Sequence, residues 1–290
     1  MSSPTTGTGT DVRPILADFS VEMTAKDVDA MLEAAPSLPP GTRINVTFLG
    51  NEDAGMRRAA ARAVRDAGFR PVPHISARRI ADRDELDDFV GALHADGTSD
   101  SLFVIAGDPP EPIGPYDGAI DVITSGIVGR YGVRCVGVGG YPEGHPLIPE
   151  ADLWSSLEQK VAAIAEAGAE GEIITQFGFD VDAVLRWVDG VRQRGIDLPI
   201  RIGVPGPAGI KRLVGYARRF GVGTSAGIAK KYGFSITNLL GTAGPDRFIT
   251  ELAAKYDEHR HGAIALHFYT FGGLRATAEW IQEFRKESAR

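Results

Sequence analysis

The sequence predicts a single parallel (β/α)8 TIM barrel, and three observations support this fold class. Eight short apolar segments recur along the 290 residues, several of them rich in Val and Ile on both faces, as expected for strands that are covered on both sides. Amphipathic stretches alternate with these segments, which is typical of a parallel α/β fold. The length suits a barrel, which needs about 250 residues, and no linker or change in composition divides the chain.

The elements follow one another regularly. The predicted strands are residues 15–22, 43–50, 71–77, 102–108, 135–141, 172–179, 200–205 and 263–270. Amphipathic helices are predicted at 54–67, 153–167, 181–194 and 274–286. Asp180 directly precedes the third of these helices and suits its N-cap.

The segment 209–258 carries at least three helical pieces, so we expect one or two extra helices before the last strand. A doubly wound open sheet is the competing fold. No GxGxxG follows the first strand, however, and eight similar units favour closure into a barrel. We expect residues 1–10 to form a disordered tail, because they offer nothing to bury, and residues 11–290 to form one barrel domain.

The composition excludes several classes of function. With 38 acidic and 31 basic residues the net charge is −7, which argues against nucleic acid or an anionic membrane as the main partner. The single cysteine, Cys135, cannot form an internal disulfide and is interpreted as a small buried side chain. No Cys/His cluster indicates a metal site. The N-terminus lacks the apolar core of a signal peptide, no apolar run could span a membrane, and we expect a cytoplasmic protein.

Nearly every predicted strand ends on a side chain that can take part in chemistry. These residues are Glu22, Thr47, His74, Ser76, Asp108, Tyr141, Thr175, Gln176, His267 and Tyr269. The carboxyl ends of barrel strands build the catalytic face, so we expect these side chains on one rim.

Taken singly, several of these residues have a structural explanation. Glu22 can end a strand in solvent, Asp108 in GDPP can form a turn, and His74 can be a hydrogen-bonded core histidine. Tyr141 can be a core residue with a satisfied hydroxyl. Gln176 is harder to explain in this way, because a buried amide needs several hydrogen-bond partners. Their joint placement indicates a site without naming its reaction.

These rim residues carry a resemblance to a known family. The segments SVEMT, NVTFLG, PHIS, AGDPP, GYPEGHP, IITQFGFD, VPGP and HFYT occur in this order. In them the chain resembles the methylenetetrahydrofolate reductases, and the similarity spans almost everything beyond the tail. The TQFxFD and HFYT elements are the most specific. The departures described below mark this chain as a divergent member.

The resemblance implies an oxidoreductase of one-carbon metabolism. Such an enzyme takes a hydride from NADH or NADPH, usually through FAD, and reduces 5,10-methylenetetrahydrofolate to 5-methyltetrahydrofolate. Glu22 matches the general acid that protonates N10 of the folate, and desolvation on the rim would raise its pKa toward the working pH. Asp108 matches the aspartate that approaches flavin and pterin. By the same resemblance Gln176 and Tyr269 contact the substrate, and Thr47, His74 and Tyr141 line the flavin pocket.

Three departures concern charged contacts. The family's LRGD run is IAGD here, with Ala106 in place of Arg. The stretch VAAIAEAGAEGE lacks the family's basic residues for the flavin pyrophosphate, and Glu166, Glu170 and Glu172 add negative charge. After HFYT the family's Leu-Asn-Arg, whose Arg helps hold folate, is replaced by Phe271, Gly272 and Gly273, with Arg275 as a substitute.

The departures leave three outcomes open for the cofactor. FAD binds through other loops, such as those of Arg78 and Arg79; FAD binds weakly; or the nicotinamide passes its hydride directly to the folate. The retained Asp108, Thr47 and Tyr141 favour FAD narrowly. The donor is NADH or NADPH, since a 2′-phosphate would need a rim cation such as Arg78, Arg79 or Lys211.

Two other classes of protein were weighed. A non-catalytic folate-binding relative has no evident need for the acid Glu22 alongside Asp108 and Gln176. A barrel lyase or aldolase that forms a Schiff base needs a lysine at a strand end, and none of the eight predicted ends offers one. The resemblance also implies a homo-oligomer. The direction in which the reaction runs in the cell is not encoded.

Overall fold

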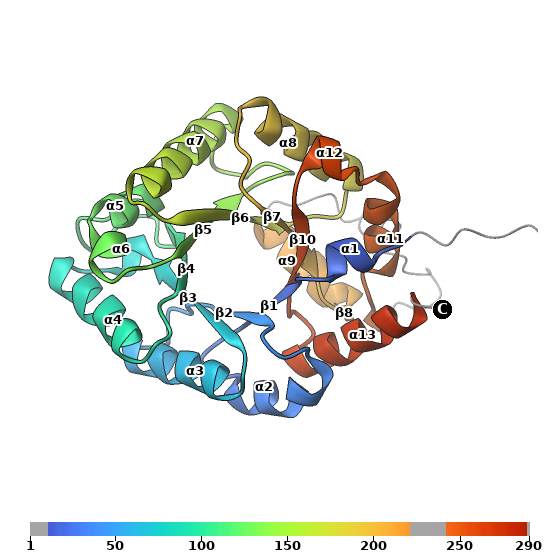
Figure 1. Ribbon diagram of the computed structural model, residues 1–290, viewed down its shortest axis with the longest axis horizontal. Coiled ribbons are helices and arrows are strands. Elements are labelled where there is room, and N and C mark those ends of the chain that lie inside the picture. Colours follow the sequence, from blue (N-terminus) through green and yellow to red (C-terminus); the bar gives the residue numbers. More distant parts are fainter. Residues whose placement is uncertain (1–10, 221–241, 289–290) are drawn as a thin grey trace, which may run out of the picture.

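The computed structural model describes residues 11–220 and 242–288. In it eight parallel strands close into a barrel in the order β1-β10-β7-β6-β5-β4-β3-β2, with helices around the outside (Figure 1). The barrel strands are β1 Ser20–Met23, β2 Arg43–Val46, β3 Arg70–Ser76, β4 Ser101–Ile105, β5 Cys135–Gly140, β6 Glu170–Phe177, β7 Ile200–Pro205 and β10 Ile264–Tyr269. The predicted (β/α)8 fold is confirmed. The predicted tail, residues 1–10, lies outside the described residues.

The helices that surround the barrel match the predicted ones and add several more. They are α1 Arg13–Leu16, α2 Val28–Ala34, α3 Ala54–Asp66, α4 Arg83–Ala95, α5 Ala119–Thr124, α6 Ile127–Arg130, α7 Glu150–Glu166, α8 Val181–Gln193 and α13 Leu274–Glu287, with 3-10 turns at Ala35–Ser37 and Ala77–Arg79. The N-cap prediction is confirmed, because the Asp180 carboxylate accepts from the backbone of Asp182 and Ala183. None of the described helices is both long and apolar enough to cross a membrane.

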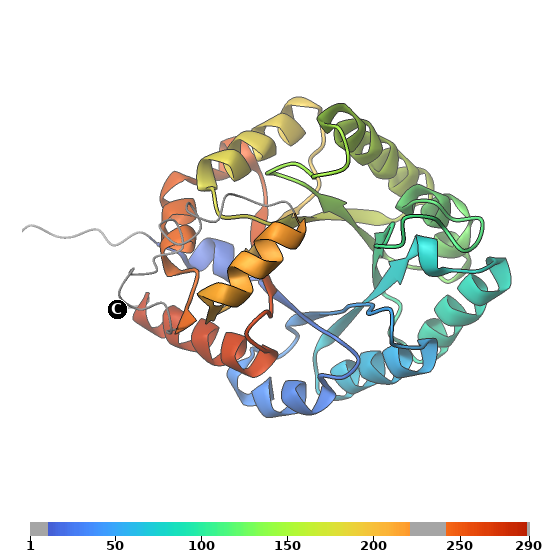
Figure 2. The same cartoon turned by 180° about the vertical axis from the view of Figure 1, so that it is seen from behind.

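The expected extra helices lie between β7 and β10. The described residues there form α9 Ile210–Phe220, α11 Asp246–Lys255 and α12 Glu258–His261, and a two-residue pairing joins β8 Ala208–Gly209 to β9 Thr242–Ala243. Seen from the carboxyl ends of the strands, α9 crosses the mouth of the barrel, whereas α11 stays in the outer ring (Figure 2). Helix α9 therefore forms part of the wall above the strand ends.

Three predicted strands were too long. The first was expected at 15–22, but residues 13–16 are helix α1, because Pro14 suits the first turn of a helix. Strand β2 ends at Val46 and β4 at Ile105. Thr47 and Asp108 therefore lie on loops. The loop after β4 turns at Gly107, whose φ of +96° favours glycine and whose Cβ, if present, would clash with the Ser76 hydroxyl.

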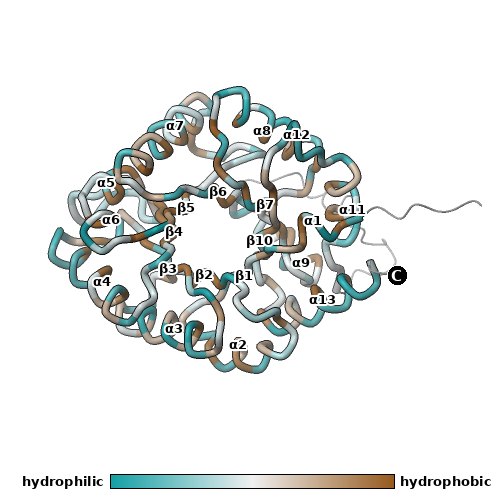
Figure 3. Tube along the Cα trace, viewed as in Figure 1, coloured by the Kyte–Doolittle hydropathy of each residue, from teal (hydrophilic) through white to brown (hydrophobic). Residues whose placement is uncertain are grey.

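The strands bury apolar residues toward the helices, where Val21, Ile44 and Val138 are inaccessible to solvent. Figure 3 shows hydrophobic residues concentrated in the strands and hydrophilic residues on the outer faces of the helices. The alternate, inward-pointing positions are polar over much of the barrel. The buried residues Ser20, Asn45, His74, Glu172, Arg201 and His267 occupy them.

At the amino end of the barrel these inward charges are paired. The Glu172 carboxylate contacts Arg43, and its second oxygen accepts from Arg201 Nε at 2.9 Å. Arg201 also pairs with Asp18 at 2.6 Å. Cys135, expected to be buried, is half-buried at this end, and burial raises the pKa of its thiol. The amino end is thus held by a buried ionic network.

Candidate active site

Glu22 lies on β1 at the carboxyl rim, with 17% of its side chain exposed. Burial, reinforced by the negative charge of Asp27, raises the pKa of this carboxyl from 4.5 to about 8. Asp27 is held in place by the backbone N–H and hydroxyl of Thr24. The raised pKa favours the protonated form of Glu22 at neutral pH, and a proton donor needs this form.

A buried histidine faces Glu22 from the neighbouring strand. His267 Nε2 lies 3.8 Å from Glu22 Oε2, and its Nδ1 lies 2.8 Å from the Ser20 hydroxyl. Burial, followed by the positive charge of Arg201, lowers the pKa of His267 to about 3. The imidazole is thus neutral, and none of the described residues places a cation beside the carboxyl of Glu22.

Two tyrosines complete this part of the rim. The Tyr269 hydroxyl donates to the Thr175 carbonyl at 3.0 Å. Burial raises the pKa of Tyr269 well above 10, and the neighbouring Glu22 and Tyr141 add to the effect. Burial also raises the pKa of Tyr141. Glu22, Tyr269 and Tyr141, predicted from separate strands, are therefore brought together as neutral polar groups.

Gln176 ends β6 on the same rim. It is half-buried, and its Oε1 accepts from the backbone N–H of Phe177 at 3.1 Å. The described residues supply no hydrogen-bond partner for its NH2 group, which is therefore available to a ligand. The sequence indicated that this amide needs hydrogen-bond partners. The structure supplies one for its oxygen and, within the described residues, none for its nitrogen.

The structure places His74 deeper than the other rim candidates. Its Nε2 lies 3.2 Å from Asn45 Nδ2, and its ring packs on Phe103 with centroids 4.8 Å apart. Burial, followed by the charge of His267, lowers its pKa to about 3. His74 is a neutral interior histidine. Thr47 is half-buried in the loop after β2, where its N–H donates to Met23 at 2.8 Å.

Asp108 lies on the loop after β4 and is exposed to solvent. Its side chain is 68% exposed, and its carboxylate lies 3.4 Å from Arg79. Arg78 pairs with Asp117 at 2.9 Å and donates to the carbonyls of Asp117 and Pro109. The two arginines proposed for a cofactor are thus already engaged.

Other predicted charges fall elsewhere than expected. Arg275 of α13 pairs with Glu279 of the same helix and with Glu33 of α2. Glu170 and Glu172 begin β6 and lie at the amino end of the barrel, opposite the rim. The expectation that they add charge beside a cofactor phosphate is therefore wrong, because α7 runs back along the outside and delivers its C-terminus to the other end.

Two buried or half-buried carboxylates that the sequence did not single out organise the rim loops. Glu52 accepts from Ala25 N–H at 3.0 Å and Leu49 N–H at 3.2 Å, joining the loops after β1 and β2. Glu143 accepts from Phe179 N–H at 2.6 Å and Asp180 N–H at 3.0 Å, joining the loops after β5 and β6. Glu143 lies in the quoted GYPEGHP segment. A carboxylate that accepts from the backbone N–H groups of another loop leaves no further pattern in a sequence.

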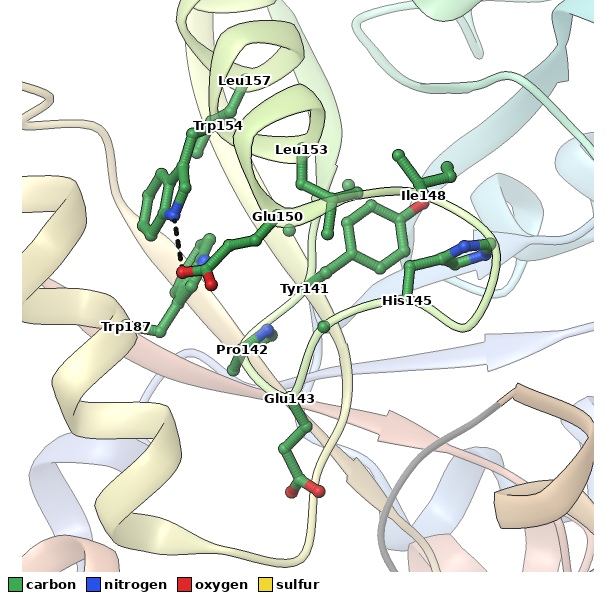
Figure 4. A pocket seen from close by; sticks show the side chains of 13 residues that line it. Tyr141, Pro142, Glu143, His145, Ile148, Glu150, Leu153, Trp154, Leu157 and Trp187 are labelled. Carbon is green, nitrogen blue, oxygen red and sulfur yellow. Dashed lines mark hydrogen bonds between the residues drawn. The ribbon is translucent and has the colours of Figure 1, made fainter.

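A cavity of about 370 Å³ opens beside Tyr141, between the loop after β5 and helices α7 and α8. Figure 4 shows the ring of Tyr141 at its centre, with His145 on one side and Trp154 on the other. Trp154 stacks on Trp187 with centroids 5.7 Å apart, and its indole N–H donates to Glu150. The rim therefore continues into a pocket of a size suited to small molecules. Within the described chain no three His, Cys, Asp or Glu side chains are grouped to hold a metal ion.

Comparison with known proteins shows the family to which this chain belongs. The model of the methylenetetrahydrofolate reductase family matches residues 17–284. The chain belongs to the methylenetetrahydrofolate reductase family. This confirms the resemblance carried by the rim motifs.

Individual family members are similar over shorter stretches. Methylenetetrahydrofolate reductase 2 of Saccharomyces cerevisiae is 35% identical over 46% of this chain and 22% of its own length. Methylenetetrahydrofolate reductase (NADH) 1 of Arabidopsis thaliana is 30% identical over 64% of this chain and 33% of its own length. The 5,10-methylenetetrahydrofolate reductase of Escherichia coli is 30% identical over 58% of this chain and 60% of its own length. The matches thus span less than two thirds of each relative.

Among solved structures, an uncharacterised protein from Clostridium thermocellum shares the fold. It superposes with a TM-score of 0.57 at 10% identity, covering 96% of this chain and 98% of that one. That protein is described as binding two copies of 5-methyl-5,6,7,8-tetrahydrofolic acid. At this identity the likeness shows the barrel fold alone.

Proposed function

We propose that this protein reduces 5,10-methylenetetrahydrofolate to 5-methyltetrahydrofolate with NADH or NADPH as the hydride donor. The observation that carries the proposal is Glu22, a rim carboxyl with no counterion among the described residues, whose pKa, raised by burial to about 8, favours the protonated form at neutral pH. Membership of the methylenetetrahydrofolate reductase family supplies the reaction class.

The chemistry follows from the position of this acid. Glu22 protonates N10, the bond between N10 and the bridging carbon breaks, and N5 with that carbon becomes an electrophilic iminium. A hydride from the reduced nicotinamide then adds to the carbon and gives the methyl group. The Gln176 NH2, which has no partner among the described residues, would hydrogen-bond the pterin, and the partly buried Tyr269 lies beside Glu22.

FAD, the family's usual intermediary, is a separate question. Thr47 and Tyr141 lie at the rim and His74 lies below it, but the described cations nearest to the rim do not fit a pyrophosphate. Arg79 is paired with Asp108 and Arg78 with Asp117. Lys160 on α7 is buried, with its amine 3.4 Å from the Gly139 carbonyl and its pKa lowered by burial to about 8. We therefore derive no step through a flavin, and FAD stays a prediction beside direct hydride transfer.

Anionic parts of the substrate and donor still need cations. Lys26 after β1 and Lys211 after β7 are exposed, and neither has an ion-pair partner among the described side chains. We assign these lysines to the glutamate tail of the folate or the phosphates of the nicotinamide donor. Assembly into a homo-oligomer remains a prediction, and size-exclusion chromatography with light scattering tests it.

The deciding experiment follows oxidation of NADH, and separately of NADPH, by protein stripped of flavin, with methylenetetrahydrofolate as acceptor. The same assay is repeated after adding FAD. Unchanged turnover in the two states establishes direct transfer, and turnover only with FAD establishes the flavin route. Absence of turnover with both donors, in both directions and in both flavin states contradicts the proposal and favours the non-catalytic folate-binding relative.

A further inference from the structure

We propose that Ser20 and His267 act as a positioning pair that fixes which oxygen of Glu22 carries the acidic proton. The inference rests on the proposed function of Glu22 as the proton donor. It concerns two residues that sit beneath the rim, one layer deeper in the barrel than Glu22.

The strand register creates the pair. Ser20 of β1 lies opposite His267 of β10, and both point into the barrel. Ser20 is 0% exposed and His267 is 1% exposed. A hydroxyl buried to this extent needs an acceptor for its proton, and His267 Nδ1, at 2.8 Å, is its hydrogen-bond partner among the described residues.

This hydrogen bond selects the tautomer. We assign the Ser20 hydroxyl as the donor to Nδ1, because no other acceptor for its proton is found among the described residues. With this assignment Nδ1 carries the lone pair and the ring proton lies on Nε2. Nε2 faces Glu22 Oε2 at 3.8 Å. An N–H that faces a carboxylic acid favours the unprotonated oxygen as acceptor, so Oε2 is held as the carbonyl and the proton lies on Oε1.

The distance of 3.8 Å exceeds that of a hydrogen bond. Contacts of catalytic groups are often long without substrate and shorten in the reacting complex. A small movement of Glu22 toward His267 would make the hydrogen bond and turn Oε1 toward the substrate. Ser20 and His267 would then act through Glu22 without touching the substrate.

The surrounding charges keep the pair neutral. His267 is faced by Arg201 and Arg43, by Glu172 and by the neutral His74. Glu22 is faced by Asp27, His267 and Tyr269, with Tyr141 beyond. A protonated imidazole is disfavoured by its burial and by two arginines, so His267 presents one N–H to Glu22 over the whole working pH range.

The proposal is first tested without activity. In protein labelled with 15N-histidine, the ring nitrogens of His267 should report a proton on Nε2 and a bare Nδ1. Ser20→Ala should shift the population toward the other tautomer. A proton on Nδ1 in the unaltered protein overturns the proposal, even if reduction of the folate is observed. The expected tautomer in a protein without turnover leaves the positioning pair intact and removes only the proposed function.

The kinetic test uses three substitutions. His267→Phe retains packing but loses the N–H, and its kcat should fall about tenfold or more, the effect of a hydrogen bond to a charged group. The KM for the folate should change less than about twofold, because the residue does not touch substrate. His267→Gln, whose amide N–H can reach Glu22, should restore most of kcat. Ser20→Ala should lower kcat by a few-fold only, about the effect of one neutral hydrogen bond.

The pH profile separates positioning from packing. Loss of the N–H removes a donor that stabilises ionised Glu22, so the alkaline limb of kcat should move to higher pH in His267→Phe and return in His267→Gln. His261→Gln is the matched control, since His261 is also buried but pairs with Asp257 and Asp189 outside the barrel; it should leave the limb unchanged. If His267→Phe does not fold, Ser20→Ala and His267→Gln decide. An unchanged kcat in Ser20→Ala contradicts the proposal. A His267→Gln protein that folds but is inactive also contradicts it.

Discussion

The two ends of the barrel interior bury polar side chains in opposite ways. At the amino end Glu172, Arg43 and Arg201 are charged and directly paired. At the carboxyl end His267 is buried and Glu22 is mostly buried, and burial favours the neutral form of both, with pKa values moved to about 3 and about 8. Pairing serves stability, whereas a polar group left without a counterion keeps a proton that chemistry can use.

The largest effect is expected from removing the unpaired acid at the carboxyl end. Glu22→Gln retains the shape of the side chain but cannot donate the proton, so kcat should fall by about 10²–10⁴-fold. Folate binding, measured by calorimetry, should stay near normal. Unchanged turnover would show that Glu22 is not the proton donor and that its lack of a described counterion has no role in the reaction.

The next largest effect is expected from breaking the paired end. Glu172→Gln leaves Arg43 and Arg201 buried without their shared carboxylate, and unfolding in urea should show a loss of about 3–5 kcal/mol. The protein that remains folded should keep its kcat, because the site lies at the other end. A stability loss below 1 kcal/mol would mean that the network is not the main support of the amino end.

A third measurement sharpens the contrast through pH. In the unfolded chain Glu22 ionises near pH 4.5, whereas in the fold it ionises near 8, so the unfolded state binds fewer protons between these values. Stability attributable to Glu22 is therefore full below pH 4.5 and is lost as pH rises toward 8. Between pH 6.0 and 7.5, Glu22→Gln should gain about 2 kcal/mol relative to the unaltered protein. If the stability difference between the two proteins does not vary with pH, the pKa of the Glu22 carboxyl is not raised.

The smallest effect is expected where an amino-end pair is exposed to solvent. Arg134 and Asp100 form an ion pair with 75% and 69% of their side chains exposed. Arg134→Ala should cost less than about 1 kcal/mol, and less still at high salt. Chemical denaturation at two salt concentrations measures this. A cost close to that of Glu172→Gln would mean that burial is not what distinguishes the network.

The sequence was sufficient for the barrel and for placing part of the predicted residues at the carboxyl ends of the strands. Strand and helix periods identified the eight units, and the quoted motifs identified Glu22, Gln176 and Tyr269. It was insufficient where long-range register decides. The pairing of Ser20 with His267, and of Glu172 with two arginines, depends on which strands are neighbours after closure. The exposure of Asp108 depends on where β4 ends, and propensity locates such boundaries poorly.

Glu52 and Glu143 have a consequence for how this rim can be altered. Glu52, on the loop after β2, accepts from Ala25 of the loop after β1 and from Leu49 of its own loop. Glu143, on the loop after β5, accepts from Phe179 and Asp180 of the loop after β6. The loops after β1 and β2 therefore form one unit of exchange, and those after β5 and β6 form another. Grafting a single loop from a relative would remove the hydrogen bonds between the two loops, one for Glu52 and two for Glu143. Grafting both loops of a pair would keep these hydrogen bonds.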